Sequence, residues 1–129
     1  MKEELELKLV KKYPNLYRQY KGNPSETCMH WGFVCGNGWF DLIDKLSEKL
    51  SKFEGVEAAQ VKEKFGGLRF YIDGTTKKNR EEVHNLTMNA EIESFTICEN
   101  CGNPGERRSG NWVRTLCDEC EAKGVSRLK

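Results

Sequence analysis

Two CxxC pairs near the end of the chain carry the strongest chemical signal in this sequence. They are Cys98-Glu-Asn-Cys101 and Cys117-Asp-Glu-Cys120, and fifteen residues separate them. This spacing is typical of a zinc site with four thiolate ligands. Four protein ligands leave no open coordination position on the ion. The pattern therefore predicts a structural Zn²⁺ cofactor, with an iron site or a redox dithiol as alternatives.

Motifs of several enzyme classes are absent from the sequence. The HxE and PCxxC signature of zinc-dependent base deaminases does not occur, because His30 precedes Trp-Gly, His84 precedes Asn-Leu and Ile97 precedes Cys98. A phosphate-binding P-loop, a GxSxG elbow and an HExxH helix are also missing. A non-catalytic protein is therefore favoured, and a small nuclease or hydrolase ranks third among the functions considered.

The stretch QVKEKFGGLRFYIDG predicts a β-hairpin that concentrates cations on one face. Gly66-Gly67 would form the turn and place Lys64 opposite Arg69. Side chains alternate along each strand, so the polar face would carry Lys62, Lys64, Arg69 and Tyr71. The apolar face would carry Val61, Phe65, Leu68, Phe70 and Ile72. Opposed cations destabilise a strand pair by up to about 1 kcal/mol, so either water absorbs the repulsion or the face holds an anion.

Other residues could complete such an anion site. Trp31 or Tyr71 could stack on a base or donate a hydrogen bond beside the cations. The turn Gly36-Asn37-Gly38 precedes an expected helix, where free amides favour an anion. The alternative for this turn is an ordinary helix start capped by Asn37. The predicted ligand residues are Lys62, Lys64, Arg69, Tyr71, Trp31, Asn37 and Gly38.

Two further groups of residues have weaker chemical signals. Cys28, His30 and Cys35, with His84 near them, could form a second metal site, but their spacing matches no standard pattern. Free cysteines and an ordinary histidine are the favoured interpretation. Glu63 falls on the apolar face of the hairpin. It is either a buried acid with a raised pKa or a marginal residue paired with a cation.

Apolar periodicity predicts an α+β fold in which two or three helices pack on a small antiparallel sheet. Helices are expected over residues 3–12, 39–50 and 75–94, the last with Thr75 or Thr76 as its N-cap. A polar loop follows the first helix, which ends near Pro14. We expect an α+β domain over 1–94 and a zinc ribbon over 95–129.

Composition limits the classes of function. The 129 residues carry 21 Lys+Arg and 20 Asp+Glu, a net charge of +1, so any anion site must be a local patch. The amphipathic start lacks the apolar core of a signal peptide and no segment is apolar enough to span a bilayer. A cytoplasmic location is therefore expected. In the ribbon, Arg107, Arg108 and Arg114 could contact nucleic acid, or the ribbon tip could be solvated or contact a protein.

Four segments, MHWGFVCGNGWFDLIDKL, QVKEKFGGLRFYIDG, CENCGNPG and WVRTLCDEC, together resemble a family of small proteins of tailed phages and prophages whose function is uncharacterised. The resemblance covers most of the chain and implies a role inside an infected bacterium, in the host cytoplasm. Accessory phage proteins of this kind often bind a host component, including the nucleotide signals of antiviral defence. By analogy, an anti-defence role is expected.

The leading hypothesis is a non-catalytic binding protein that holds a phosphate-bearing ligand, either a nucleotide signal or a nucleic acid. Lys62, Lys64 and Arg69 would neutralise the phosphate, and zinc would only stabilise the tail. The alternative is an interaction module or inhibitor that docks on a host or phage protein through the ribbon.

Overall fold

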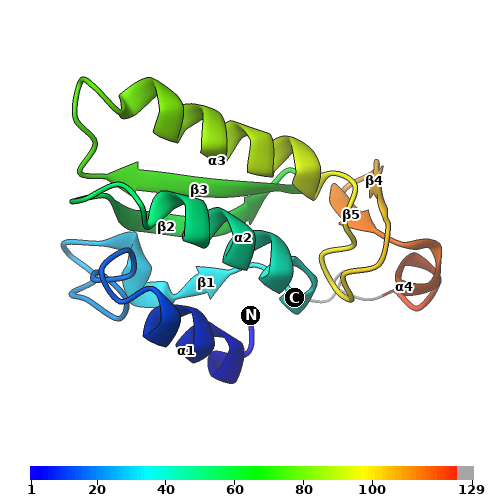
Figure 1. The fold of residues 1–129 in the computed structure, drawn as a ribbon. Helices are drawn as coiled ribbons and strands as arrows, with labels where there is room; N and C mark the ends of the chain where they lie inside the picture. Colours follow the sequence, from blue (N-terminus) through cyan, green and yellow to red (C-terminus); the bar gives the residue numbers. More distant parts are fainter. Residues whose placement is uncertain (125–129) are drawn as a thin grey trace.

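A computed structural model describes residues 1–124 and confirms the α+β class (Figure 1). Its helices are α1 (Glu3–Lys12), α2 (Phe40–Leu50), α3 (Arg80–Ser94) and α4 (Asp118–Ala122). Its strands are β1 (Phe33–Val34), β2 (Glu57–Lys64), β3 (Gly67–Asp73), β4 (Glu106–Arg108) and β5 (Arg114–Leu116). Residues 125–129 of the predicted ribbon lie outside the described part of the chain.

The larger sheet has the strand order β1-β2-β3 and is mixed, because β1 pairs with β2 in parallel and β3 pairs with β2 antiparallel. An entirely antiparallel sheet was expected, so this detail is corrected. Strands β4 and β5 form a second, antiparallel pair. Figure 1 shows α3 running along β3 and α2 crossing in front of the sheet, with β4, β5 and α4 gathered at one end. None of the helices within residues 1–124 has the length and apolar character needed to cross a bilayer.

The predicted helices form with small changes at their ends. Helix α2 and its N-cap residue bury the apolar stripe that the periodicity predicted, which consists of Trp39, Leu42, Ile43, Leu46 and Leu50. Helix α3 begins later than predicted. Asn79 Oδ1 accepts from the Thr76 amide at 2.8 Å, while Thr76 Oγ1 accepts from the Asn79 amide at 3.3 Å. This reciprocal pair fixes the turn before the helix and moves its start to Arg80.

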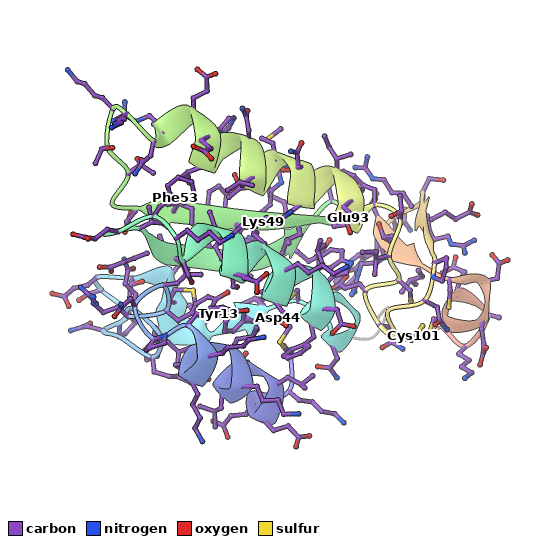
Figure 2. All side chains as sticks on the ribbon, viewed as in Figure 1. Tyr13, Asp44, Lys49, Phe53, Glu93 and Cys101 are labelled. Carbon is purple, nitrogen blue, oxygen red and sulfur yellow. The ribbon has the colours of Figure 1, made fainter. Side chains whose placement is uncertain are left out.

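Polar contacts join α1 and the loop after it to α2. Tyr13 follows α1, and its hydroxyl donates to Asp44 Oδ1 at 2.6 Å (Figure 2). Lys12 Nζ lies 3.1 Å from the same carboxylate. Deeper in the core, the Tyr17 hydroxyl lies 2.5 Å from Ser47 Oγ. These contacts hold α1 and the loop after it against α2, and the Tyr17 ring packs edge-on against the buried ring of Phe33 in β1.

The hairpin register differs from the prediction by two residues. Lys64 faces Gly67 rather than Arg69, and Lys62 faces Arg69. The turn is formed by Phe65 and Gly66, which have φ angles of 53° and 84°, as a type I′ turn requires at both central positions. Phe65 is 60% exposed and does not join the apolar face.

Packing against the ribbon explains this register. A Cβ at Gly67 would lie 2.7 Å from the Phe95 ring, so the strand can pass under that ring only at a glycine. The Thr115 hydroxyl of β5 donates to the Gly66 carbonyl at 2.6 Å. Gly67 is therefore a strand residue beneath the ring, and the turn falls one position earlier. A pair of opposed cations survives the correction, as Lys62 and Arg69.

The corrected register predicts the effect of replacing Phe65 with Asn. Asn tolerates positive φ far better than Phe, and Asn-Gly is a preferred type I′ turn. We expect Phe65→Asn to stabilise the protein by a few tenths of a kcal/mol, up to about 1 kcal/mol, in urea unfolding. In a register that pairs Phe65 with Leu68, Phe65 would be a strand residue. A loss of stability greater than about 1 kcal/mol would therefore contradict the observed turn.

Candidate metal centre and ligand-binding groove

The four predicted metal ligands come together in the ribbon. The Sγ atoms of Cys98, Cys101, Cys117 and Cys120 all lie within 4.8 Å of one another. The Cys101 and Cys117 sulfurs are 3.7 Å apart. Metal–sulfur bonds of about 2.3 Å in a tetrahedron place the sulfurs about 3.8 Å apart, whereas a disulfide needs about 2.05 Å. The cluster therefore has the spacing of a metal site and not of disulfides.

Charge within the cluster also favours a cation. Burial pushes the pKa of the Cys98 thiol upward, but the backbone N–H groups of Cys117, Cys101 and Asn100 stabilise its thiolate and bring the pKa down to about 7. Asn100 Nδ2 donates to the Cys120 sulfur at 3.3 Å, yet burial and the neighbouring cysteines raise the pKa of Cys120 to about 12. Four thiolates at this spacing repel one another, so a bound cation is needed for all of them to be ionised.

The first CxxC turn packs directly on the turn that precedes α2. The Gly38 amide donates to the Glu99 carbonyl at 2.7 Å. A Cβ at Gly38 would lie 2.1 Å from the Cys98 carbonyl oxygen, and one at Gly36 would lie 2.3 Å from the Glu99 carbonyl oxygen. The two glycines are therefore required for a close approach of backbones. The Gly38 N–H, predicted to bind a ligand, is used within the protein.

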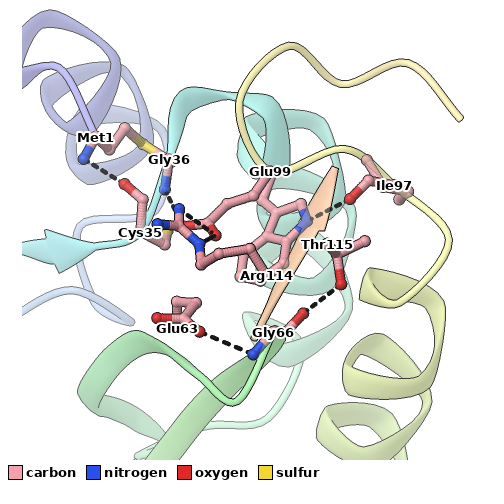
Figure 3. Close-up of polar contacts among 10 residues, drawn as sticks. Met1, Cys35, Gly36, Glu63, Gly66, Ile97, Glu99, Arg114 and Thr115 are labelled. Carbon is pink, nitrogen blue, oxygen red and sulfur yellow. Dashed lines mark hydrogen bonds and ion pairs between the residues drawn. The ribbon is translucent and has the colours of Figure 1, made fainter. Parts of the chain in front are cut away.

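Glu99 is the main contact of this junction, and the sequence analysis did not identify it. Its Oε1 accepts from Arg114 Nε at 2.9 Å and from Arg114 Nη2 at 2.6 Å (Figure 3). Its Oε2 accepts from the Gly36 amide at 2.7 Å. Burial raises the pKa of Glu99, while Arg114 and the Gly36 amide oppose that rise. The Gly36-Asn37-Gly38 turn does bind an anion, but the anion is the chain's own carboxylate.

The ribbon arginines are engaged in the fold. Arg114 is 4% exposed, so its predicted role as a surface contact to nucleic acid is wrong. Arg108 donates to Asp118 at 2.8 Å and to the Leu116 carbonyl. The Arg107 guanidinium lies 4.8 Å from the centroid of the Phe95 ring. Among these three residues, only Arg107 is both exposed and without an ion pair in the described part of the chain.

A groove between β3 and α3 gathers the other candidate functional residues. Its volume is about 360 Å³. Arg69 and Tyr71 line it from β3, and Arg80, His84 and Thr87 line it from α3. Glu91 is the one carboxylate among the lining residues, and its Oε2 lies 3.6 Å from Arg69 Nε. The groove thus places two guanidinium groups, an imidazole and hydroxyl groups around one cavity.

The remaining predicted ligand residues lie outside this groove. Lys62 lies beside Arg69 on the neighbouring strand, and Lys64 is exposed near the turn. Asn37 Oδ1 accepts from the Lys2 amide at 2.8 Å. Trp31 lines a different cleft, at the far edge of the sheet. The structure therefore brings Arg69 and Tyr71 together and separates them from the predicted aromatic partner Trp31 and the Gly36–Gly38 turn.

Arg80 was not identified from the sequence, and His84 was considered only as a metal ligand. The positions of the polar residues along α3 could have indicated that both lie on one face of the helix. Arg80, His84, Thr87 and Glu91 recur at intervals of three or four residues, next to the apolar stripe that contains Val83. Residues at this spacing share one face of a helix. The direction of that face toward β3 depends on packing across the sheet, which the helix sequence alone does not determine.

Within the described residues, the second candidate metal site does not come together. Among residues 1–124, the four ribbon cysteines are the one group with the proximity that a metal ion requires. His30 Nδ1 lies 2.7 Å from the Gly22 carbonyl oxygen, and Cys28 and Cys35 are free thiols. Glu63 is half-buried, and its Oε2 accepts from the Gly66 amide at 2.8 Å. It therefore stabilises the hairpin turn from the sheet margin.

The chain was compared with protein-family models, with curated proteins and with solved structures, and none of them matches it.

The cysteine cluster predicts one tightly bound metal ion per chain. Elemental analysis should find it, and Cys117→Ser should lose it because three thiolates bind far more weakly than four. Limited proteolysis should then cleave the tail of the variant first, since metal binding supplies most of the folding energy of such a ribbon. Cys28→Ser is the matched control, and it should keep the metal. Metal-free wild-type protein with an equally resistant tail would contradict the prediction.

The packed turn predicts a stability difference between neighbouring substitutions. Gly38→Ala forces a methyl group into the backbone of the metal site and should destabilise the protein by about 1–3 kcal/mol, the usual cost of overpacking. Asn37→Ala removes one exposed hydrogen bond and should cost less than about 1 kcal/mol. Chemical unfolding of both variants measures the difference. Equal stabilities would show that the ribbon does not pack on this turn.

Proposed function

We propose that this chain is a non-catalytic binding protein that holds a phosphate-bearing ligand of nucleotide size in the groove between β3 and α3. The observation that carries the proposal is the position of Arg69 and Arg80, which line one cavity from the strand and from the helix. Cavities of about 300 Å³ and above are the usual size for small-molecule ligands. The volume of about 360 Å³ suits a nucleotide better than a duplex nucleic acid.

The state of Arg69 supports an anionic ligand. Arg69 is the cross-strand partner of Lys62, and a bound phosphate would relieve the repulsion between the two cations. Its ion pair with Glu91 is loose, at 3.6 Å, and its buried Nε has no hydrogen-bond partner within residues 1–124. Buried donors without partners are rare in native proteins. A ligand that reorients Arg69 would satisfy this donor and gain a bidentate contact.

The other groove residues suit the rest of a nucleotide. Tyr71 is partly exposed and its ring can stack on a base, while its hydroxyl and that of Thr87 can bond phosphate or sugar oxygens. His84 is exposed and adds a hydrogen-bond donor. Lys62 and Lys64 extend the positive charge along the adjoining strand. Binding should therefore weaken as salt concentration rises.

The metal in this proposal is Zn²⁺, and its role is structural. Thiolate ligands and tetrahedral spacing favour zinc among the common divalent ions. All four ligands come from the protein, so no position is left for a reactive water. Because the coordination is closed, a binding function is favoured over an enzymatic one, and a nuclease or hydrolase is the weakest candidate. Elemental analysis that finds zinc, and nucleotides that remain chemically unchanged after incubation, would support both parts.

The resemblance to phage proteins supplies a setting for the ligand. Within an infected bacterium, a groove of this charge could sequester a nucleotide signal of antiviral defence. Cyclic dinucleotides carry two phosphates, and they therefore belong in any ligand screen together with mononucleotides and short oligonucleotides. The anti-defence role predicts that the wild-type gene restores phage infection of a bacterium that carries such a nucleotide-signalling defence. A groove variant should not restore it.

The binding proposal predicts selective loss of ligand stabilisation. A thermal-shift screen should find at least one phosphate compound that raises the melting temperature of the wild-type protein. Arg69→Gln and Arg80→Gln should each preserve the melting temperature without ligand to within a few degrees. Both should reduce the affinity for that compound by about tenfold or more, because a charge-assisted bond to phosphate is lost.

Arg18→Gln is the matched control for these variants. Arg18 also forms a loose surface ion pair, at 3.5 Å from Glu57, but it lies outside the groove. The control should respond to the ligand as the wild-type protein does. If no phosphate compound stabilises the wild-type protein, or if all three variants respond equally, the groove does not bind phosphate.

A further inference from the structure

We infer that the chain has a second binding site, which accepts an arginine side chain of a partner protein. The site is a cleft of about 410 Å³ between β1, the hairpin tip and the ribbon. Its lining includes three carboxylates, from Glu6, Glu63 and Glu99, and two cations, the Arg114 guanidinium and the Met1 ammonium, which donates to the Phe33 and Cys35 carbonyls. Two tryptophans, Trp31 and Trp112, also line it. None of these residues lines the groove between β3 and α3, so the inference does not rest on the proposed function.

The carboxylates of the cleft differ in how fully the fold uses them. Glu99 is bound by Arg114 and by the Gly36 amide. Glu6 is buried, and its two oxygens accept from the Tyr20 hydroxyl at 2.7 Å and from the Phe33 amide at 2.9 Å. Glu63 has one interaction, from the Gly66 amide to Oε2. Glu63 makes no ion pair within residues 1–124, so it is the carboxylate that can bind an incoming cation.

The tryptophans supply flat, exposed surfaces beside this carboxylate. Trp31 is 67% exposed and Trp112 is 41% exposed, and both are among the largest apolar side chains that contact solvent. The His30 ring packs edge-on against Trp31 at a centroid distance of 4.6 Å, and His30 is itself held at the Gly22 carbonyl. Exposed indoles around a concave site are typical of binding hot spots. Indole is also the strongest aromatic partner for a cation.

A carboxylate beside exposed indole rings favours a guanidinium group over other ligands. Three carboxylates against two cations leave a net negative charge in the cleft, which disfavours phosphate, the ligand class proposed for the groove. A guanidinium is planar, so it can stack on indole rings and at the same time present paired N–H donors to a carboxylate. An ammonium group can do neither with the same geometry. Val34, exposed on the neighbouring strand β1, extends the apolar rim and can contact the aliphatic part of the arginine side chain or its neighbours.

The test is an NMR titration of the full-length protein with short peptides. The chain has three tryptophans, and their indole N–H signals report on the site separately. A Gly-Ser peptide with two central arginines should shift the signals of Trp31 and Trp112 in a saturable way. The signal of Trp39 should not move, because Trp39 is buried and its Nε1 donates to the Ile97 carbonyl at 2.9 Å. Matched peptides with lysine or with citrulline should bind at least about tenfold more weakly.

Two variants and one control complete the experiment. Glu63→Gln should reduce the affinity for the arginine peptide by about tenfold or more. It should keep the turn, since the glutamine oxygen can still accept from the Gly66 amide. Trp112→Ala should reduce the affinity for this peptide by a similar factor. Glu57→Gln, on the same strand but outside the cleft, should bind as the wild-type protein does. No shift of Trp31 and Trp112, equal binding of the citrulline peptide, or unchanged binding by Glu63→Gln would each overturn the inference.

Discussion

The buried carboxylate of Glu99 is the contact on which the arrangement of this molecule depends. A carboxylate away from water is costly unless strong donors surround it, and here Arg114 and the Gly36 amide supply them. Glu99 lies between the first two cysteines, Arg114 lies on β5 and Gly36 precedes α2. One carboxylate therefore connects both halves of the cysteine cluster to the α+β domain. Removing one partner of such a pair costs about 3–5 kcal/mol.

This junction gives the metal a role beyond the ribbon. Within its described residues, 95–124, the ribbon has a very small apolar core, in which Leu116 is the one large apolar residue that is buried apart from the cysteines. A metal ion held by the four cysteines would stabilise the ribbon, whose surface packs against the rest of the protein at the Gly36–Gly38 turn and the hairpin tip. Phe95 covers Gly67 and Thr115 binds the Gly66 carbonyl, so the ribbon also fixes the hairpin register. That register places Lys62 opposite Arg69. Although the net charge of the chain is only +1, the charge is distributed unevenly. Two arginines line the groove and three carboxylates line the cleft.

The sequence predicted features that depend on local spacing. The cysteine cluster and the buried stripe of α2 follow from intervals of a few residues, and both are confirmed. The hairpin was predicted, but its predicted register was wrong. Gly67 is a strand residue that packs beneath the Phe95 ring, about thirty residues away, and is not part of the turn. Glu99 was missed because a glutamate inside CxxC looks like a solvated residue until its partner on β5 is known. Arg80 was missed for a related reason, since a polar stripe on a helix becomes a groove only when a strand faces it.

The central functional claim is that the groove between β3 and α3 holds a phosphate-bearing ligand. The most direct measurement is a map of NMR chemical-shift changes on titration with a nucleotide or cyclic dinucleotide, recorded for backbone amides and for the imidazole of His84. The account predicts saturable shifts concentrated at Arg69, Tyr71, Arg80 and His84, with Trp31 and Trp112 unaffected. Shifts confined to the tryptophan cleft, or no shifts with any phosphate compound at millimolar concentration, would contradict it.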